Sequence, residues 1–157
     1  MRLSRLLIAT VLVWFAGILP ASLQVQAADS RILKVLPHYL DAQGRHTLSP
    51  SLYERDAYQA LLRKNPSKIS GLRFDIHWRA DRKASTPATL RMELRTSKHQ
   101  GTDVLVLETP LPAKRSRGWT PLTLDNDAYR AAGDIQAWHA TIREGDKVLA
   151  ESNSFLW

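Results

Sequence analysis

The histidines of this sequence are its best candidates for acid–base or metal chemistry, but they are scattered. They stand at positions His38, His46, His77, His99 and His139. No two are two or four positions apart, the spacings that would place two imidazoles side by side on a strand or on one turn of a helix. We therefore expect no local metal site, and surface hydrogen bonds or cross-strand pairs are the predicted role of these side chains.

Other catalytic groups are equally sparse. The chain has no cysteine, which excludes disulfides, a thiolate nucleophile and cysteine-ligated zinc or iron–sulfur centres. A serine hydrolase of the Gly-x-Ser-x-Gly kind is not indicated, because that motif does not occur. No two acids stand together on an expected buried strand. The sequence predicts a protein without catalytic activity and without a cofactor; the alternative is a small periplasmic hydrolase or metal-binding protein.

Positive charge is the most informative chemical feature. The chain carries a net charge of +7, and residues 63–118 hold 13 Lys and Arg against five Asp and Glu, whereas residues 119–157 have a net charge of −3. Such a basic middle attracts anionic partners. The expected contact residues are Arg73, Arg79, Arg91, Arg95, Lys114, Arg115 and Arg117.

The chemistry of the partner stays open at this point. An anionic component of the cell envelope, such as lipopolysaccharide phosphate, anionic lipid or acidic glycan, fits the basic residues, and so does an acidic protein surface. Nucleic acid is disfavoured, because no basic–aromatic RNA-binding motif is present. The alternative is that these side chains only keep a sheet soluble and prevent edge pairing.

Tryptophan offers a second kind of binding surface. Trp78 and Trp138 fall on the apolar faces of their expected strands, which predicts packing in the core. Trp119 follows a basic loop and Trp157 ends the sequence, so neither is tied to a core face. If exposed, these two indoles would be able to stack on a sugar.

The N-terminal segment has the three parts of a secretory signal. Arg2 and Arg5 precede an apolar run at residues 6–19, and Val25-Gln26-Ala27 supplies small or β-branched residues for cleavage after Ala27. The 14-residue run is short for a spanning helix, which needs roughly 20 residues. We therefore predict a signal peptide at 1–27 and one domain at 28–157. The domain would be periplasmic or secreted, with no transmembrane segment after cleavage.

One helix is expected near residues 50–64. Ser49-Pro50 resembles a helix start, and Asn65-Pro66 ends the pattern because proline cannot continue the hydrogen-bond ladder. Tyr53, Ala57, Ala60 and Leu61 form one stripe, which we expect to pack on a sheet. The alternative is an amphipathic helix that binds a partner.

The pattern of the remaining residues predicts short strands. Residues 71–80 alternate strictly, with Leu72, Phe74, Ile76 and Trp78 on one face, and residues 89–96 repeat the pattern. We expect a further strand at 31–40, kinked or bulged near Pro37. Two more are expected at 104–107, deeply buried, and at 119–124. A C-terminal hairpin of 135–143 and 147–155 would place Ile142 opposite Val148 and His139 beside Glu151.

About seven short strands with one inserted helix predict a mostly β protein, a small antiparallel β-sandwich. The pattern over residues 32–157 resembles immunoglobulin-like or fibronectin type III-like domains. It includes the stretch 133–138, where such domains often carry a tyrosine corner and this chain has Ile135. Residues 36–65 and the ending Ser154-Phe155-Leu156-Trp157 also resemble secreted bacterial proteins without an assigned activity. These resemblances imply export and fold only.

Overall fold

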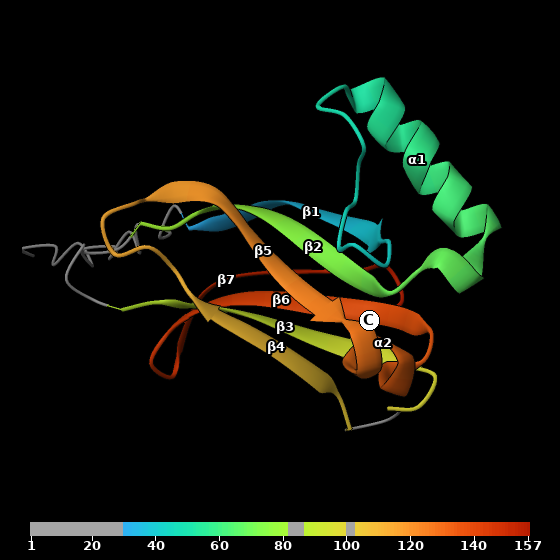
Figure 1. Ribbon diagram of the computed structural model, residues 1–157. Coiled ribbons are helices and arrows are strands. Elements are labelled where there is room, and N and C mark those ends of the chain that lie inside the picture. The colour runs from blue at the N-terminus through green and yellow to red at the C-terminus, as the bar shows by residue number, and fades with distance from the viewer. Residues whose placement is uncertain (1–29, 82–86, 100–102) are drawn as a thin grey trace, which may run out of the picture.

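The computed structural model describes residues 30–81, 87–99 and 103–157, so the predicted signal peptide lies outside the described residues. Within these described ranges, seven strands, two α-helices and one short 3-10 helix follow one another (Figure 1). Their bounds are β1 (Arg31–Leu40), α1 (Leu52–Lys64), η1 (Pro66–Lys68), β2 (Gly71–Arg79), β3 (Thr89–Thr96), β4 (Leu105–Pro110), β5 (Arg117–Asp125), α2 (Asn126–Ala132), β6 (Ile135–Glu144) and β7 (Lys147–Asn153).

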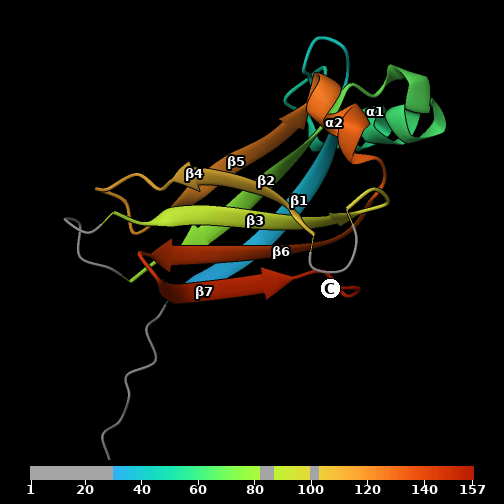
Figure 2. The same ribbon diagram turned by 90° about the horizontal axis from the view of Figure 1, so that it is seen from below.

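The strands form two antiparallel sheets that pack face to face (Figures 1 and 2). One sheet has the order β1-β2-β5 and the other β4-β3-β6-β7, so the chain changes sheet between β2 and β3, between β4 and β5, and again after β5. A three-stranded and a four-stranded sheet joined by Greek-key connections form the immunoglobulin-like sandwich arrangement. The predicted fold class is confirmed.

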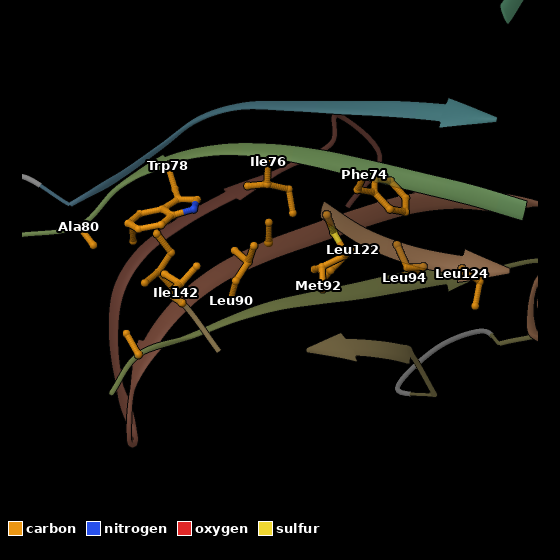
Figure 3. Packing of buried hydrophobic residues seen from close by; sticks show 14 of the residues in the cluster. Phe74, Ile76, Trp78, Ala80, Leu90, Met92, Leu94, Leu122, Leu124 and Ile142 are labelled. Atoms are coloured by element: carbon orange, nitrogen blue, oxygen red, sulfur yellow. The ribbon is translucent and has the colours of Figure 1, made fainter. Parts of the chain in front are cut away.

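The core lies between the sheets and is built by the alternation seen in the sequence. Phe74, Ile76 and Trp78 from β2 are at most 1 % exposed, and Leu90, Met92 and Leu94 from β3 face them fully buried (Figure 3). Burying each of these side chains contributes about 1.5–3 kcal/mol. The indole Nε1 of Trp78 also donates to the Thr120 hydroxyl at 2.8 Å, so its one polar atom is satisfied in the core.

Two strand predictions are wrong in detail. Strand β4 is an edge strand whose side chains are only partly buried, although Leu105 and Leu107 touch the core. The bulge in β1 lies at Ile32/Lys34 instead of Pro37. Pro37 stays in register with Phe74, because β1 is also an edge strand and tolerates a residue without an N–H.

The C-terminal hairpin differs from the prediction by one residue in register at the turn and by two residues beyond a bulge. Glu144 pairs with Lys147, a bulge separates Ile142 from Arg143, and Ile142 lies opposite Ala150 instead of Val148. The turn is therefore two residues long, and Gly145 has φ +57° as the tight turn requires.

The helix is also placed differently from the prediction. It begins at Leu52 after Ser51, and the predicted stripe faces solvent, with Tyr53 83 % exposed. The buried residues are Gln59 and Leu62 instead. The reason is that α1 projects from the end of the three-stranded sheet and does not lie flat on it (Figure 1), so polar contacts hold it in place.

Helix α2, seven residues long, is absent from the sequence prediction, because such a short segment carries no periodic pattern. Within the ranges described, neither α-helix has the length and apolar character needed to cross a membrane.

Candidate functional site

The predicted basic residues do not share one face. Strands β2 and β3 belong to different sheets, so Arg73 and Arg79 lie on the outer face of the three-stranded sheet. Arg91 and Arg95 lie on the outer face of the four-stranded sheet, on the opposite side of the sandwich. Arg117 begins β5 in the three-stranded sheet, and Lys114 and Arg115 stand in the loop before it. Five of the seven predicted residues are thus associated with the three-stranded sheet.

One end of that sheet is rich in arginine. Arg79 pairs in register with Arg31 on β1 and with Arg117 on β5, so three arginines form one row across all three strands. The loop with Lys114 and Arg115 is attached at the same end, where the Ala80 amide donates to the Ser116 carbonyl at 2.7 Å. We call Arg31, Arg79, Lys114, Arg115 and Arg117 the basic end.

An aromatic pair occupies the next outward-facing row. His77 is in register with Trp119, and the two rings stack with centroids 4.6 Å apart and planes 11° apart. Trp119 is 49 % exposed. The prediction that Trp119 is free of the core is confirmed. Its indole is a flat, exposed apolar surface on β5, at the edge of the sheet.

A pocket closes the other end of the face. The connection between β1 and β2, which contains α1, folds back over the sheet and leaves a depression of about 310 Å³. We call this depression the insertion pocket. Its walls are Leu36, His38, His46, Arg55, Arg73, Asp75 and Trp119.

Charged and aromatic groups in the insertion pocket are held close together. Arg73 donates to Asp75 Oδ1 through Nε at 2.9 Å and Nη2 at 2.7 Å. The other oxygen, Asp75 Oδ2, is 3.7 Å from His38 Nε2. The rings of His38 and His46 lie 5.3 Å apart. Sequence spacing gave no sign of this cluster, because a folded-back connection brings its members together.

Burial lowers the pKa of both pocket histidines. For His38 desolvation is the main cause; Asp75 opposes it, while His46, Arg55 and Arg73 lower the pKa further. For His46 desolvation is again the main cause, followed by the charge of Arg73. Both imidazoles are therefore neutral at pH 7, and each offers one hydrogen-bond donor and one acceptor.

The arginines decide what kind of ligand the pocket accepts. Arg55 and Arg73 lie near enough to the histidines to disfavour their protonation, and the same charges disfavour a bound cation. Among the described residues, no group of three or more His, Asp or Glu side chains is placed to hold a metal ion. The pocket suits a polar ligand that combines hydrogen-bonding groups with a negative charge.

Asp41 fixes the connection that forms the roof of the pocket. Its carboxylate accepts from the amides of Gln43 and Arg45, from Arg45 Nε, each at 2.9 Å, and from the Tyr58 hydroxyl at 2.6 Å. Burial alone would raise the pKa of Asp41, but these hydrogen bonds lower it to about 2. The Asp41 carbonyl also accepts from the Ser70 hydroxyl, which joins the connection to the start of β2.

Gln59 attaches α1 to the free edge of β1. Its Oε1 accepts from the Tyr39 amide at 2.8 Å, and its Nε2 donates to the Tyr39 carbonyl at 2.9 Å. A third bond joins Nε2 to the His46 carbonyl at 2.8 Å. The side-chain amide thus pairs with β1 as a neighbouring strand would, and it holds the segment carrying His46 over the sheet.

The opposite sheet face pairs its charges internally. Arg91 donates to Glu108 at 2.6 Å and to Glu93 at 2.9 Å, and these bonds raise its pKa. His139 lies 3.3 Å from both Glu93 and Glu151, which confirms the predicted contact with Glu151.

The chain end covers another arginine of that face. The Arg95 guanidinium lies 4.3 Å from the centroid of the Trp157 ring, and His139 stacks on the same indole. Trp157 is therefore engaged by its own chain, whereas Trp119 on the other sheet keeps half of its surface exposed.

Similarity to known proteins is found in structure and not in sequence. The chain matches no family model, and no curated protein matches it. Among solved structures, it is similar to an immunoglobulin-like protein from Pseudomonas aeruginosa. The two are 15 % identical with a TM-score of 0.34, and the match covers 82 % of this chain and 96 % of the other.

Proposed function

We propose that this protein is an exported, non-catalytic binding module that contacts anionic material of the cell envelope. The contact surface is the outer face of the β1-β2-β5 sheet with the loop before β5. The observation that carries this proposal is the arginine row of Arg31, Arg79 and Arg117, which Lys114 and Arg115 extend at the same end.

Two predicted contact residues, Arg91 and Arg95, lie on the other face of the sandwich. Arg91 holds two carboxylates of its own sheet, and Arg95 is stacked on Trp157. We therefore assign Arg91 and Arg95 to the stability of the four-stranded sheet. Location is the criterion, since Arg73 is itself paired with Asp75: Arg73, Arg79, Lys114, Arg115 and Arg117 are associated with the three-stranded sheet and remain as proposed contact residues.

Export rests on the N-terminal sequence pattern. Expression of the full chain in a bacterial host, followed by fractionation and N-terminal sequencing, tests it. We expect the protein in the periplasm or medium, beginning at Ala28. Retention of residues 1–27 on a cytoplasmic protein would contradict this part of the proposal.

Salt-dependent retention tests the binding function. The exported protein is applied to immobilised heparin and to lipopolysaccharide-coated beads at low ionic strength, and we expect retention that falls as salt screens the charges. The variant Lys114→Glu with Arg117→Glu should elute at much lower salt.

A matched control separates location from net charge. Lys147→Glu with Arg130→Glu makes the same change in charge on β7 and α2, outside the proposed contact surface. We expect its elution to stay close to that of the wild type. Equal losses in both double variants would show that net charge alone governs retention, and absence of retention at low salt would refute the proposed function.

A further inference from the structure

The outer face of the β1-β2-β5 sheet combines three different surfaces in one line. Along β2, Arg79 belongs to the basic end, His77 supports Trp119, and Asp75 and Arg73 line the insertion pocket. Extended strand from Arg73 to Arg79 has a length of about 20 Å. A ligand that used all three surfaces would be an extended chain of several units.

Trp119 indicates what kind of unit lies in the middle. The imidazole of His77 stacks on the Trp119 indole, and half of the residue is exposed. An exposed indole beside polar groups favours a ligand with one apolar face and a polar rim. A pyranose ring has that character, because its axial C–H groups form an apolar face and its hydroxyls lie around the edge.

The insertion pocket combines groups that suit a sugar acid. Arg73 and Arg55 bind Asp75 and Asp56 through Nε and Nη2, and the remaining N–H groups of each planar guanidinium can donate to a ligand carboxylate. Asp75 Oδ2 lies 3.7 Å from His38 Nε2, which is too far for a close hydrogen bond. As a carboxylate oxygen it can accept a hydrogen bond from a ligand hydroxyl. The neutral imidazoles of His38 and His46 supply both donors and acceptors for hydroxyl groups.

The aspartate distinguishes a glycan from a simple phosphate polymer. A phosphate chain presents only acceptors and negative charge, so it would meet Asp75 with repulsion. A sugar hydroxyl can donate to Asp75 while a carboxylate on the same or the next ring binds an arginine. The mixed set of one acid, two arginines and two histidines therefore favours an acidic sugar.

We propose that the sheet face binds an acidic polysaccharide, with one pyranose ring stacked on Trp119 and a uronic-acid carboxylate held by Arg73 and Arg55 in the insertion pocket. This inference rests on the proposed function and names its ligand. The basic end then binds further carboxylates of the same chain.

Calorimetry with two polyanions tests the inference. The exported protein is titrated with a galacturonic acid hexamer and, separately, with inorganic polyphosphate of the same charge, at low salt. Trp119→Val removes the platform but keeps a residue that favours β structure. We expect this variant to bind the hexamer at least tenfold more weakly and to bind polyphosphate with unchanged affinity.

Two further variants complete the test. Trp119→Phe keeps a flat ring and should retain most of the affinity for the hexamer. Trp157→Val removes an indole from the opposite sheet and should leave binding of the hexamer unchanged. A far-ultraviolet circular dichroism spectrum equal to that of the wild type shows that each variant is folded.

The possible failures are distinguishable. If the hexamer and polyphosphate bind equally and Trp119→Val weakens neither, the glycan inference is overturned while the anion-binding function stands. If neither polyanion binds the wild type at low salt, the proposed function fails and this inference fails with it.

Discussion

Asp41 shows how one buried carboxylate organises a whole connection. Four donors from the loop and from α1 converge on it, and Ser70 binds its backbone carbonyl. These contacts supplement the packing of Leu62, since the predicted apolar stripe of the helix faces solvent. The position of His46 and Arg55 over the sheet therefore depends on polar side chains.

Replacing Asp41 tests this dependence through pH. The folded-state pKa of about 2 is below the ordinary value of 3.8, so the carboxylate contributes stability above about pH 4 and loses it as the pH falls towards 2. We expect Asp41→Asn to lower the free energy of unfolding by about 1–3 kcal/mol at pH 7, because an amide has a single acceptor oxygen.

Urea denaturation from pH 7 to pH 2 measures the effect. The difference between wild type and Asp41→Asn should shrink as the pH falls below 4. Asp127→Asn, at a fully exposed position on α2, is the control and should change stability little. A difference for Asp41→Asn that stays constant across this range would contradict the assignment.

Gln59 allows a second test at a single residue. Gln59→Leu keeps the volume but leaves the amide and carbonyl of Tyr39 and the carbonyl of His46 without their partner. We expect a loss of about 2–3 kcal/mol in the free energy of unfolding. The Tyr39 amide should also exchange with solvent much faster in hydrogen-exchange measurements. Gln136→Leu, at an exposed position on β6, should change neither quantity.

At the level of elements, the buried side chains of strands with one buried face are predictable from the sequence. Those of an edge strand or of a helix held by polar contacts are less predictable. The alternation in β2 and β3 fixes which side chains enter the core, because a shift by one residue would expose every apolar group. Strand β4 has a continuous apolar run that indicates deep burial, but its position at the edge of its sheet leaves those side chains only partly covered. The C-terminal end of helix α1 is marked in the sequence by Asn65-Pro66, whereas its start lies two residues after the predicted one. Its buried face is not marked, because Gln59 is polar.

The junction between α2 and β6 depends on a glycine. Gly133 has φ +76° and ψ −155°, a region that is essentially restricted to glycine. A Cβ atom there would collide with Ser97 Oγ, which accepts from the Asp134 amide. The junction thus brings the end of α2 against the segment after β3, where the Thr96 hydroxyl donates to the Ala132 carbonyl at 2.6 Å.

Two glycine substitutions separate strain from collision. Gly133→Ala combines an unfavourable backbone with a steric clash, and we expect a loss of about 2–3 kcal/mol in the free energy of unfolding. Gly44 has φ +72°, but a Cβ at this position would have no atom within 4 Å, so Gly44→Ala should cost only about 1 kcal/mol. Thermal and urea denaturation measure both. Equal losses would show that the contact with Ser97 is unimportant.

Over the whole molecule, the two outer faces of the sandwich have different characters. On the four-stranded sheet Arg91 is neutralised by neighbouring glutamates, while the three-stranded sheet gathers an arginine row, an exposed indole and a pocket. The sequence predicts seven basic contact residues without showing that they divide between the two sheets, and it names Trp119 and Trp157 together as exposed candidates. The pocket is not predictable, because residues from β1, the connection, α1 and β2 meet there only after folding.

Lowering the pH should act on binding and on stability in opposite directions. The charges that face His38 and His46 are Asp75, Arg55 and Arg73. Because burial holds the pKa of both imidazoles below 6.5, folding disfavours their protonation, so stability is lost as the pH falls below 6.5 and through their folded pKa values. Protonation also adds positive charge to the insertion pocket, while a uronate stays ionised above roughly pH 5.

We therefore expect the galacturonic acid hexamer to bind severalfold more tightly at pH 5.5 than at pH 7.5, while the free energy of unfolding falls. Calorimetry and urea denaturation at the two pH values measure these changes. In His38→Gln with His46→Gln, both should depend less on pH, because the two imidazoles that gain a proton in the pocket have been removed. Affinity that stays constant or weakens as the wild type is acidified would contradict the placement of the sugar acid beside these histidines.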